Sequence, residues 1–192
     1  MKSITVFCGS SPGTNPRFLE QATQLGEALA QRDISLVYGG ADIGLMGAIA
    51  NGTLAANGKV IGVLPAFLQT REIAHQGLTE LIVVKSMHER KTKMNDLCDG
   101  IIALPGGFGT IEELFEILTW VQLGLQNKPI GVLNVDGYFD SLITFIKSMV
   151  SNGFLRATDA DLLIVRDNVS ELLEEMENYK CPPIKNRIED LT

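Results

Sequence analysis

GIIALPGGFGTIEELFEILTW, residues 100–120, joins a short apolar run to a turn with three glycines in four positions and then to an acidic, apolar segment with helical spacing. A strand, a tight turn and a helix in this order are typical of α/β proteins. The same alternation recurs along the chain. Short β-branched runs lie at 3–9, 34–40, 59–65, 80–85, 100–107, 128–135 and 161–167, and helical spacing lies at 15–32, 44–57, 87–98, 110–125, 138–152 and 168–178. The pattern predicts a Rossmann-like, doubly wound α/β fold with a mainly parallel sheet of about seven strands and helices on both faces.

Length and charge restrict the kind of ligand. The 192 residues suit one domain, which we place at 1–180, followed by a C-terminal tail at 181–192 that contains a Pro-Pro break. A formal net charge of -7 repels nucleic acid and anionic membranes. An anionic ligand must therefore be bound by local geometry, which favours a small molecule over a polymer.

The chain shows no targeting or membrane signal. Its first apolar run is too short for the core of a signal peptide, and no stretch reaches 18 apolar residues. Cys8, Cys98 and Cys181 are odd in number and widely spaced, which favours reduced thiols over a disulfide framework or a zinc site. We therefore expect a cytoplasmic protein without a membrane or nucleic-acid partner.

Glycine-rich turns follow three of the predicted strands: CGSSPG at 8–13, YGGADIGLMG at 38–47 and PGGFGT at 105–110. In an open parallel sheet, ligands bind at the carboxyl ends of the strands, so we expect these turns, with Gly9 and Ser10 among their residues, to form the site. None of the turns contains a GxGxxG dinucleotide fingerprint or a Walker loop, which leaves NAD binding and ATP hydrolysis as minor alternatives. We expect no cofactor.

The turn at 105–110 suits a monophosphate. Gly106, Gly107 and Gly109 let backbone N–H groups approach a ligand, and Thr110 adds a hydroxyl at the expected start of a helix whose positive end attracts anions. The alternative is a purely structural helix start, in which Thr110 as N-cap and Glu113 form a capping box.

Two neighbouring helices supply charged partners for such a phosphate. In the helix expected at 87–98, Arg90 and Lys91 lie at the edges of an apolar stripe that includes Met87, where a cation needs an anionic partner or a structural ion pair. Glu113 lies one helical turn beyond the glycines. A carboxylate there could stabilise the oxocarbenium-like state of N-glycosidic cleavage or activate water. With only two histidines and no HExxH spacing, a Ser-His-Asp site and a metal site are unsupported.

These residues also carry a family resemblance. SMHERKTKMNDLCDGIIALPGGFGTIEELFEILTWVQLG, residues 86–124, closely resembles the signature region of the Lonely Guy family, cytokinin riboside 5'-monophosphate phosphoribohydrolases, whose pattern is PGGxGTxxE preceded by MHxRK. The similarity extends from FCGSS through YGGADIGLMG and NKPIGVLNVDGYFDSL to GF at 153–154. The loop QTREIAHQGLTEL lacks the glycine-threonine run that follows REI in the family. This difference affects two expected properties, a lid formed by residues 65–79 and the specificity for the base.

The resemblance implies an enzyme that releases the free base and ribose 5-phosphate from cytokinin nucleotides or AMP, and a homodimer with its active site near the interface. It makes Arg90 and Glu113 the catalytic pair. The other residues that would contact the substrate are Gly9, Ser10, Glu72, Met87, Lys91, Gly106, Gly107, Phe108, Gly109, Thr110, Ile111, Glu112 and Thr119.

The same residues are compatible with one other function and not with a second. A nucleotide sensor or carrier could use the same cradle without cleaving its ligand, because a fold does not decide a function. Members of the family were also long labelled lysine decarboxylases, but no lysine here has the context of a Schiff-base residue in a pyridoxal enzyme.

Overall fold

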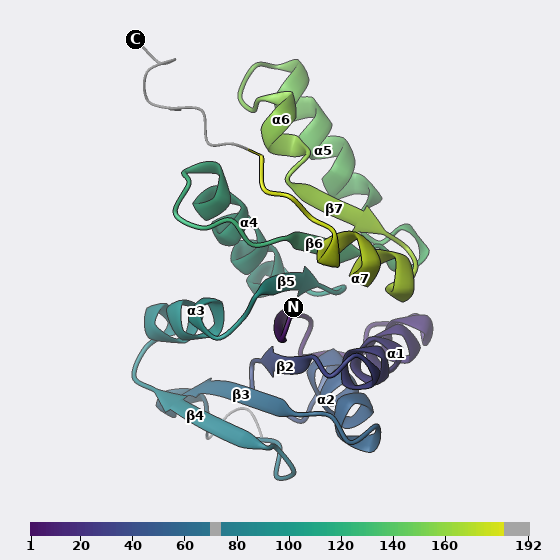
Figure 1. Cartoon of the computed structure of the whole chain (residues 1–192), viewed down its shortest axis with the longest axis vertical. Helices are drawn as coiled ribbons and strands as arrows, with labels where there is room; N and C mark the ends of the chain where they lie inside the picture. Colours follow the sequence, from purple (N-terminus) through teal and green to yellow (C-terminus); the bar gives the residue numbers. More distant parts are fainter. Residues whose placement is uncertain (70–73, 183–192) are drawn as a thin grey trace.

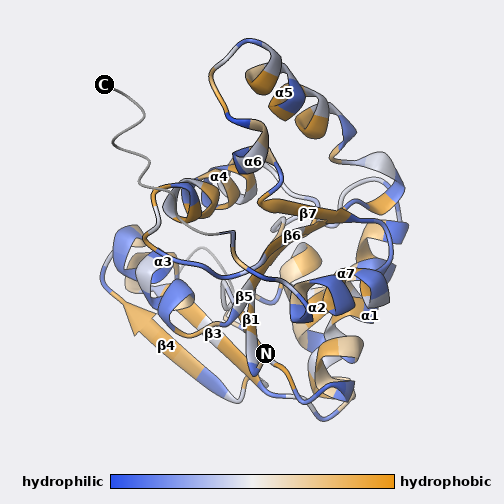
Figure 2. Cartoon of the chain, turned by 45° about the horizontal axis from the view of Figure 1, so that its top comes forward, coloured by the Kyte–Doolittle hydropathy of each residue, from blue (hydrophilic) through white to orange (hydrophobic). Residues whose placement is uncertain are grey.

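The computed structural model describes residues 1–69 and 74–182. In these residues, seven parallel strands form one twisted sheet in the order β4-β3-β2-β1-β5-β6-β7 (Figure 1). Their bounds are β1 Ser3–Phe7, β2 Ser35–Tyr38, β3 Val60–Pro65, β4 Glu80–Val84, β5 Gly100–Ala103, β6 Ile130–Leu133 and β7 Leu163–Arg166. Strands β5 and β6 are apolar and buried along their whole length, as is typical of strands covered on both faces, and β1 is buried from Ile4 to Phe7 (Figure 2). The predicted fold class is confirmed.

The order of the strands defines the place for a ligand. From β1 the chain winds outward through β2, β3 and β4, and it then returns to the other side of β1 to add β5, β6 and β7. Ile4 of β1 therefore pairs with both Leu36 of β2 and Gly100 of β5. The switch between β1 and β5 opens a crevice at their carboxyl ends, where doubly wound proteins bind ligands.

Helices cover both faces of the sheet. Helices α1 (Arg17–Gln31), α2 (Gly44–Ala55) and α7 (Val169–Glu177) pack on one face, and α3 (Met87–Asp96), α4 (Phe108–Gln122) and α5 (Asp140–Ser151) pack on the other. Each layer encloses a buried apolar cluster. In α1, for example, Ala22, Leu25 and Leu29 follow helical spacing and are fully buried.

Some local structure differs from the sequence-based expectation. The helix expected at 110–125 begins two residues earlier, at Phe108, and ends at Gln122. Three short helices were not predicted: η1 (Ala66–Leu68), η2 (Val135–Gly137) and α6 (Ala157–Ala160). Their length of about one turn leaves little periodic pattern in the sequence. No helix within residues 1–69 and 74–182 has both the length and the apolar character needed to cross a membrane.

Candidate active site

The three glycine-rich turns interlock at the carboxyl edge of the sheet. The N–H of Gly9, after β1, donates to the carbonyl of Pro105, after β5, at 3.0 Å, and the N–H of Leu45 donates to the carbonyl of Gly9 at 3.1 Å. Gly44, at the start of α2, has a φ of +55°, and a Cβ there would lie 2.4 Å from the backbone of Ser10. Glycine is therefore required at position 44 by both conformation and space.

A cleft of about 330 Å³ lies over the switch between β1 and β5. Its walls come from the first and third turns, from Leu45 of the second turn and from two aromatic side chains. The lining residues are Gly9, Ser10, Ser11, Pro12, Gly13, Phe18, Leu45, Pro105, Gly106, Gly107 and Tyr138. The structure thus brings Gly9, Ser10, Gly106 and Gly107 together, as the sequence predicted.

The glycines of the PGGFGT turn differ in what surrounds them. A Cβ on Gly106 would meet Thr110 Oγ1 at 2.1 Å and Gly9 N at 2.9 Å, so the backbone there is closely packed. A Cβ on Gly107 or Gly109 would meet no atom within 4 Å. These two positions border open space at the start of α4, where the first N–H groups of a helix have no intrahelical acceptor. An anion could approach them without displacing a side chain.

The capping-box alternative for this turn is wrong. The N-cap of α4 is Gly107, which has no side-chain cap, and Thr110 lies inside the first turn of the helix. Thr110 is 4% exposed, and its side chain packs against Gly106. Sequence reasoning placed the cap at Thr110 because glycine leaves no side chain by which to recognise a helix start.

Arg90 of α3 is held over the end of the sheet. Its side chain is 11% exposed, and its Nε donates to the carbonyl of Val63 in β3 at 3.1 Å. The guanidinium lies against the backbone of Gly39, where a Cβ would be 2.2 Å from Nη2. Any larger side chain at position 39 would displace it.

Glu113 of α4 faces this arginine. The two side chains are 3.7 Å apart between Nη1 and Oε1, and that of Glu113 is 12% exposed. Burial raises the pKa of Glu113 from about 4.5 to about 7, although the positive charge of Arg90 opposes the rise. Burial raises the pKa of the neighbouring Cys8 thiol as well, and the charge of Glu113 adds to this effect. Glu113 is therefore a carboxyl group whose charge changes near neutral pH, which suits general acid-base chemistry.

Lys91 extends the charged cluster on the side of α4. Its ammonium group forms a short ion pair with Glu112 and lies 3.1 Å from Glu116 Oε2. Burial lowers the pKa of Lys91, but the bonds to Glu112 and Glu116 outweigh burial and raise it overall. Lys91 therefore forms ion pairs with α4 and remains positively charged, and its contact with the substrate stays a prediction.

The remaining predicted residues are distributed unevenly. Met87 and Ile111 are half-buried, and Ile111 packs against the core beneath α4. Phe108 is 97% exposed at the start of α4. Glu72 and part of the expected lid at 65–79 lie outside the described residues.

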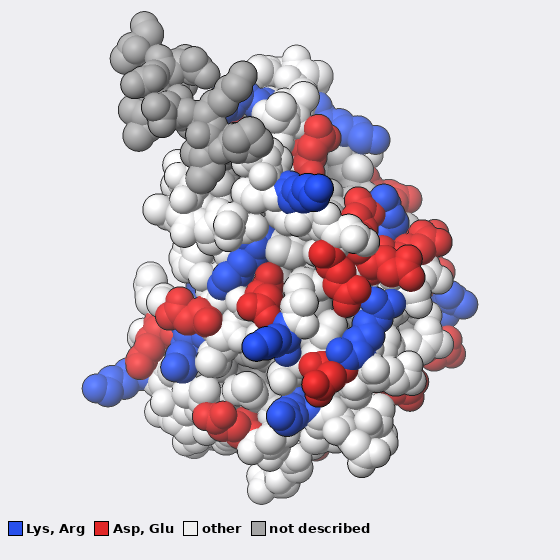
Figure 3. Space-filling model, in the orientation of Figure 1, with Lys and Arg blue, Asp and Glu red and all other residues white. Residues whose placement is uncertain are grey.

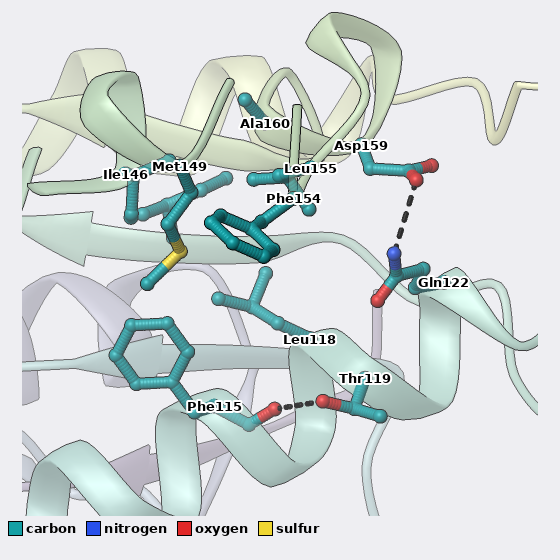
Figure 4. Close-up of a pocket in the computed structure, with 11 residues that line it drawn as sticks. Phe115, Leu118, Thr119, Gln122, Ile146, Met149, Phe154, Leu155, Asp159 and Ala160 are labelled. Carbon is teal, nitrogen blue, oxygen red and sulfur yellow. Dashed lines mark hydrogen bonds between the residues drawn. The ribbon is translucent and has the colours of Figure 1, made fainter. Parts of the chain in front are cut away.

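Thr119 lies apart from the cleft. It lines a second cavity, of about 250 Å³, between α4 and the α5–α6 region, and its hydroxyl donates to the carbonyl of Phe115 at 2.8 Å (Figure 4). The other walls of that cavity include the apolar side chains of Leu118, Met149 and Phe154. Within one chain, Thr119 thus does not join the other predicted residues.

Sequence reasoning did not identify two residues at the site. Gly39 belongs to a turn that was recognised as glycine-rich, but its contact with Arg90 is formed between segments that are distant in the chain. Tyr138, from the segment after β6, lines the cleft and donates to the carbonyl of Gly106 at 2.6 Å. The sequence signal for Tyr138 was an aromatic residue in a turn at the same sheet edge, which is too common to stand out.

The chain is similar to known proteins over nearly its whole length. A cytokinin riboside 5'-monophosphate phosphoribohydrolase of Arabidopsis thaliana is 46% identical over 93% of this chain and 82% of its own. A probable cytokinin riboside 5'-monophosphate phosphoribohydrolase of Oryza sativa subsp. japonica is 44% identical over 95% of this chain and 74% of its own. Among solved structures, the molybdenum cofactor binding protein of Rippkaea orientalis superposes with a TM-score of 0.70 at 23% identity, covering 93% of this chain and 97% of that one.

A family model described as "Possible lysine decarboxylase" matches residues 46–176. The match covers α2 to α7 and so includes Arg90, Glu113 and the glycines between them. From this match and the similarity to the plant proteins, the chain belongs to the Lonely Guy family.

Proposed function

We propose that the protein hydrolyses the N-glycosidic bond of nucleoside 5'-monophosphates, namely cytokinin riboside 5'-monophosphates, AMP or both, and releases the free base and ribose 5-phosphate. The observation that carries the proposal is the buried pair of Arg90 and Glu113, 3.7 Å apart, whose glutamate lies on the helix that begins after Gly107 in the wall of the glycine-lined cleft. The plant relatives whose names state this activity support it.

The proposed roles follow from charge and position. The N–H groups at the start of α4, with the turn after β1, bind the phosphate. The ribose then extends toward Glu113, whose carboxylate stabilises the positive charge that develops at the anomeric carbon as the bond to the base breaks. The departing nucleobase keeps the electron pair of the broken bond and takes up a proton. Water adds to the anomeric carbon and gives up a proton, for which Glu113 is a suitable acceptor because its pKa is about 7. Arg90 holds Glu113 and contacts the anionic substrate.

Lysine decarboxylation has no comparable support. A lysine that forms a Schiff base must lose its proton, which requires a lowered pKa. Lys91, the lysine of this cluster, has a raised pKa because of Glu112 and Glu116. The chemistry of this side chain therefore differs from what the description of the family model suggests.

A direct assay tests the proposal. Purified protein is incubated separately with AMP and with isopentenyladenosine monophosphate, and free base and ribose 5-phosphate are separated by chromatography. We expect release from at least one substrate, with turnover reduced about 100-fold or more in Glu113→Gln but not in Glu20→Gln, a matched change at an exposed position of α1. Absence of release from both substrates would reject the function.

A second candidate is a carrier or sensor that binds a nucleotide without cleaving it. One observation supports this candidate: the Rippkaea orientalis protein, which has a similar fold, is named as a binding protein. Tight AMP binding by calorimetry without any product would support this candidate. A carrier has no need for a buried carboxylate beside an arginine, which is why we place hydrolysis first.

We further propose a homodimer whose interface lies beside the active site, in the cytoplasm. The support is a set of exposed apolar side chains around α4, α5 and the turn before α6. They are Leu123 (64% exposed), Leu125 (71%), Phe145 (58%) and Phe154 (87%). Large exposed apolar side chains are typical of surfaces that another protein covers.

A further inference from the structure

Tyr138 connects the segment after β6 to the PGGFGT turn. Its hydroxyl donates to the carbonyl of Gly106 at 2.6 Å. Its ring makes edge-to-face contacts with Phe18, at 5.5 Å between centroids, and with Phe139, at 5.1 Å. The ring is thus held on two sides, and the hydroxyl at its end has a fixed position in the wall of the cleft.

The carbonyl that Tyr138 holds belongs to the same peptide group as the N–H of Gly107. A trans peptide is planar, and its C=O and N–H point in opposite directions. A bond that fixes the carbonyl of Gly106 therefore also fixes the direction of the Gly107 N–H. If this peptide flipped, a carbonyl oxygen would take the place of a donor.

Sterics alone leave this peptide partly free. On one side, Gly106 is closely packed against Thr110 and the backbone of Gly9. On the other side, a Cβ at Gly107 would meet nothing within 4 Å, and neither glycine carries a side chain to restrict rotation. The hydroxyl of Tyr138 supplies a restraint that the glycines lack.

We propose that Tyr138 is a positioning residue for the anion site: its hydroxyl holds the Gly106–Gly107 peptide so that the Gly107 N–H points at the phosphate of the ligand. The inference rests on the phosphate-binding part of the proposed function. It assigns to Tyr138 a contribution to affinity for phosphate-bearing ligands and none to the cleavage step. Pre-organised donors bind an anion more tightly because ordering them costs nothing at the moment of binding.

The test compares wild type with Tyr138→Phe, which keeps the ring and its two aromatic contacts and removes only the hydroxyl. Thr144→Val is the matched control, because it removes an exposed hydroxyl that donates to a backbone carbonyl at 2.8 Å within α5. Dissociation constants for ribose 5-phosphate and for adenosine are measured by calorimetry, and kcat and KM are measured with AMP. Neither dissociation constant requires turnover.

We expect Tyr138→Phe to raise the dissociation constant of ribose 5-phosphate by about twofold to tenfold, the effect of one hydrogen bond. The dissociation constant of adenosine should not change. KM for AMP rises by a similar factor at constant kcat, as for a lost interaction that ground and transition states share. Unchanged affinity for ribose 5-phosphate, or an equal loss for adenosine, would overturn the assignment. Wild-type protein that binds ribose 5-phosphate but releases no base from AMP would instead reject the proposed function alone.

Discussion

At the residue scale, the site depends on a carboxyl group that is close to half-ionised at neutral pH. Burial of Glu113 favours its neutral form, and Arg90 at 3.7 Å favours its charged form. Burial has the larger effect, so the pKa lies at about 7 instead of near 4.5. Small changes around Glu113 should therefore have measurable effects on both activity and stability.

The first consequence concerns the pH dependence of activity. If the carboxylate is the active form, kcat/KM rises as pH increases through about 7 and levels off above it. The phosphate of AMP also titrates, near pH 6. The pH profile of the residual activity of Glu113→Gln separates the two titrations. It should retain the change caused by the phosphate of AMP and lose the rise in kcat/KM near pH 7 that Glu113 causes. A profile of wild type that matches that of Glu113→Gln in shape would contradict the assignment.

The second consequence concerns the pH dependence of folding. Between pH 4.5 and 7 the folded protein keeps the proton on Glu113 and the unfolded chain loses it, so wild type loses stability as pH rises through this range. Glutamine is neutral at every pH. The free energy of unfolding is measured with urea for both proteins at pH 4 and at pH 8. We expect the difference, Glu113→Gln minus wild type, to increase by on the order of 3 kcal/mol from pH 4 to pH 8.

Glu20→Gln on α1 serves as the control for both measurements and should follow wild type. A constant difference between wild type and Glu113→Gln across the pH range would mean that the carboxyl group titrates normally in the folded protein.

At the element scale, the site is a junction of three strand ends. The sequence indicated which turns would meet, because glycine after a buried strand is typical of close backbone approach, and Gly9, Gly44 and Gly106 make such approaches. It misplaced the start of α4, since the N-cap is a glycine. It also could not reveal the position of Arg90 against Gly39, which depends on packing between α3 and the end of β2.

This contact between elements leads to a test at Gly39. Its φ is not among the positive values, so alanine suits the backbone, but its Cβ would be 2.2 Å from Arg90 Nη2. Gly39→Ala should displace the guanidinium and lower kcat/KM by about 10- to 100-fold. Gly39→Ala should also shift the midpoint of the kcat/KM profile to higher pH, because Arg90 in its normal position lowers the pKa of Glu113.

A double-mutant cycle separates this effect from general damage to the fold. In an Arg90→Ala background there is no guanidinium to displace, so Gly39→Ala should cost little further activity. Equal losses in both backgrounds would show that Gly39 acts independently of Arg90.

At the scale of the whole molecule, acidic and basic side chains are interspersed on the face that Figure 3 shows, without a large basic patch. This agrees with capture of an anion by backbone geometry. The seven-stranded parallel sheet was predictable because each strand is a short, mostly apolar run and helical spacing separates most of these runs. The division into one domain at 1–180 and a tail at 181–192 stays a prediction.

The proposed dimer provides a test at this scale. Phe154 is 87% exposed and lies over the cavity that Thr119 lines, together with Met149 and Leu118 (Figure 4). We expect Phe154→Ser to weaken self-association about tenfold or more in sedimentation equilibrium, because a large apolar side chain would leave the interface. Leu19→Ser, a partly exposed apolar residue on α1, is the control. Dimers of unchanged affinity would place the interface elsewhere.

The strand order also has a consequence for how the protein folds. β1 can pair with β2 soon after both are synthesised, but its other partner, β5, begins at Gly100, opposite Ile4. Contacts so distant in sequence form slowly, since a long loop must first close. The cleft lies at this junction, so it assembles only when the two halves of the sheet join. A nucleotide would therefore stabilise the completed native state and slow its unfolding, and it would leave the earlier steps of folding unassisted.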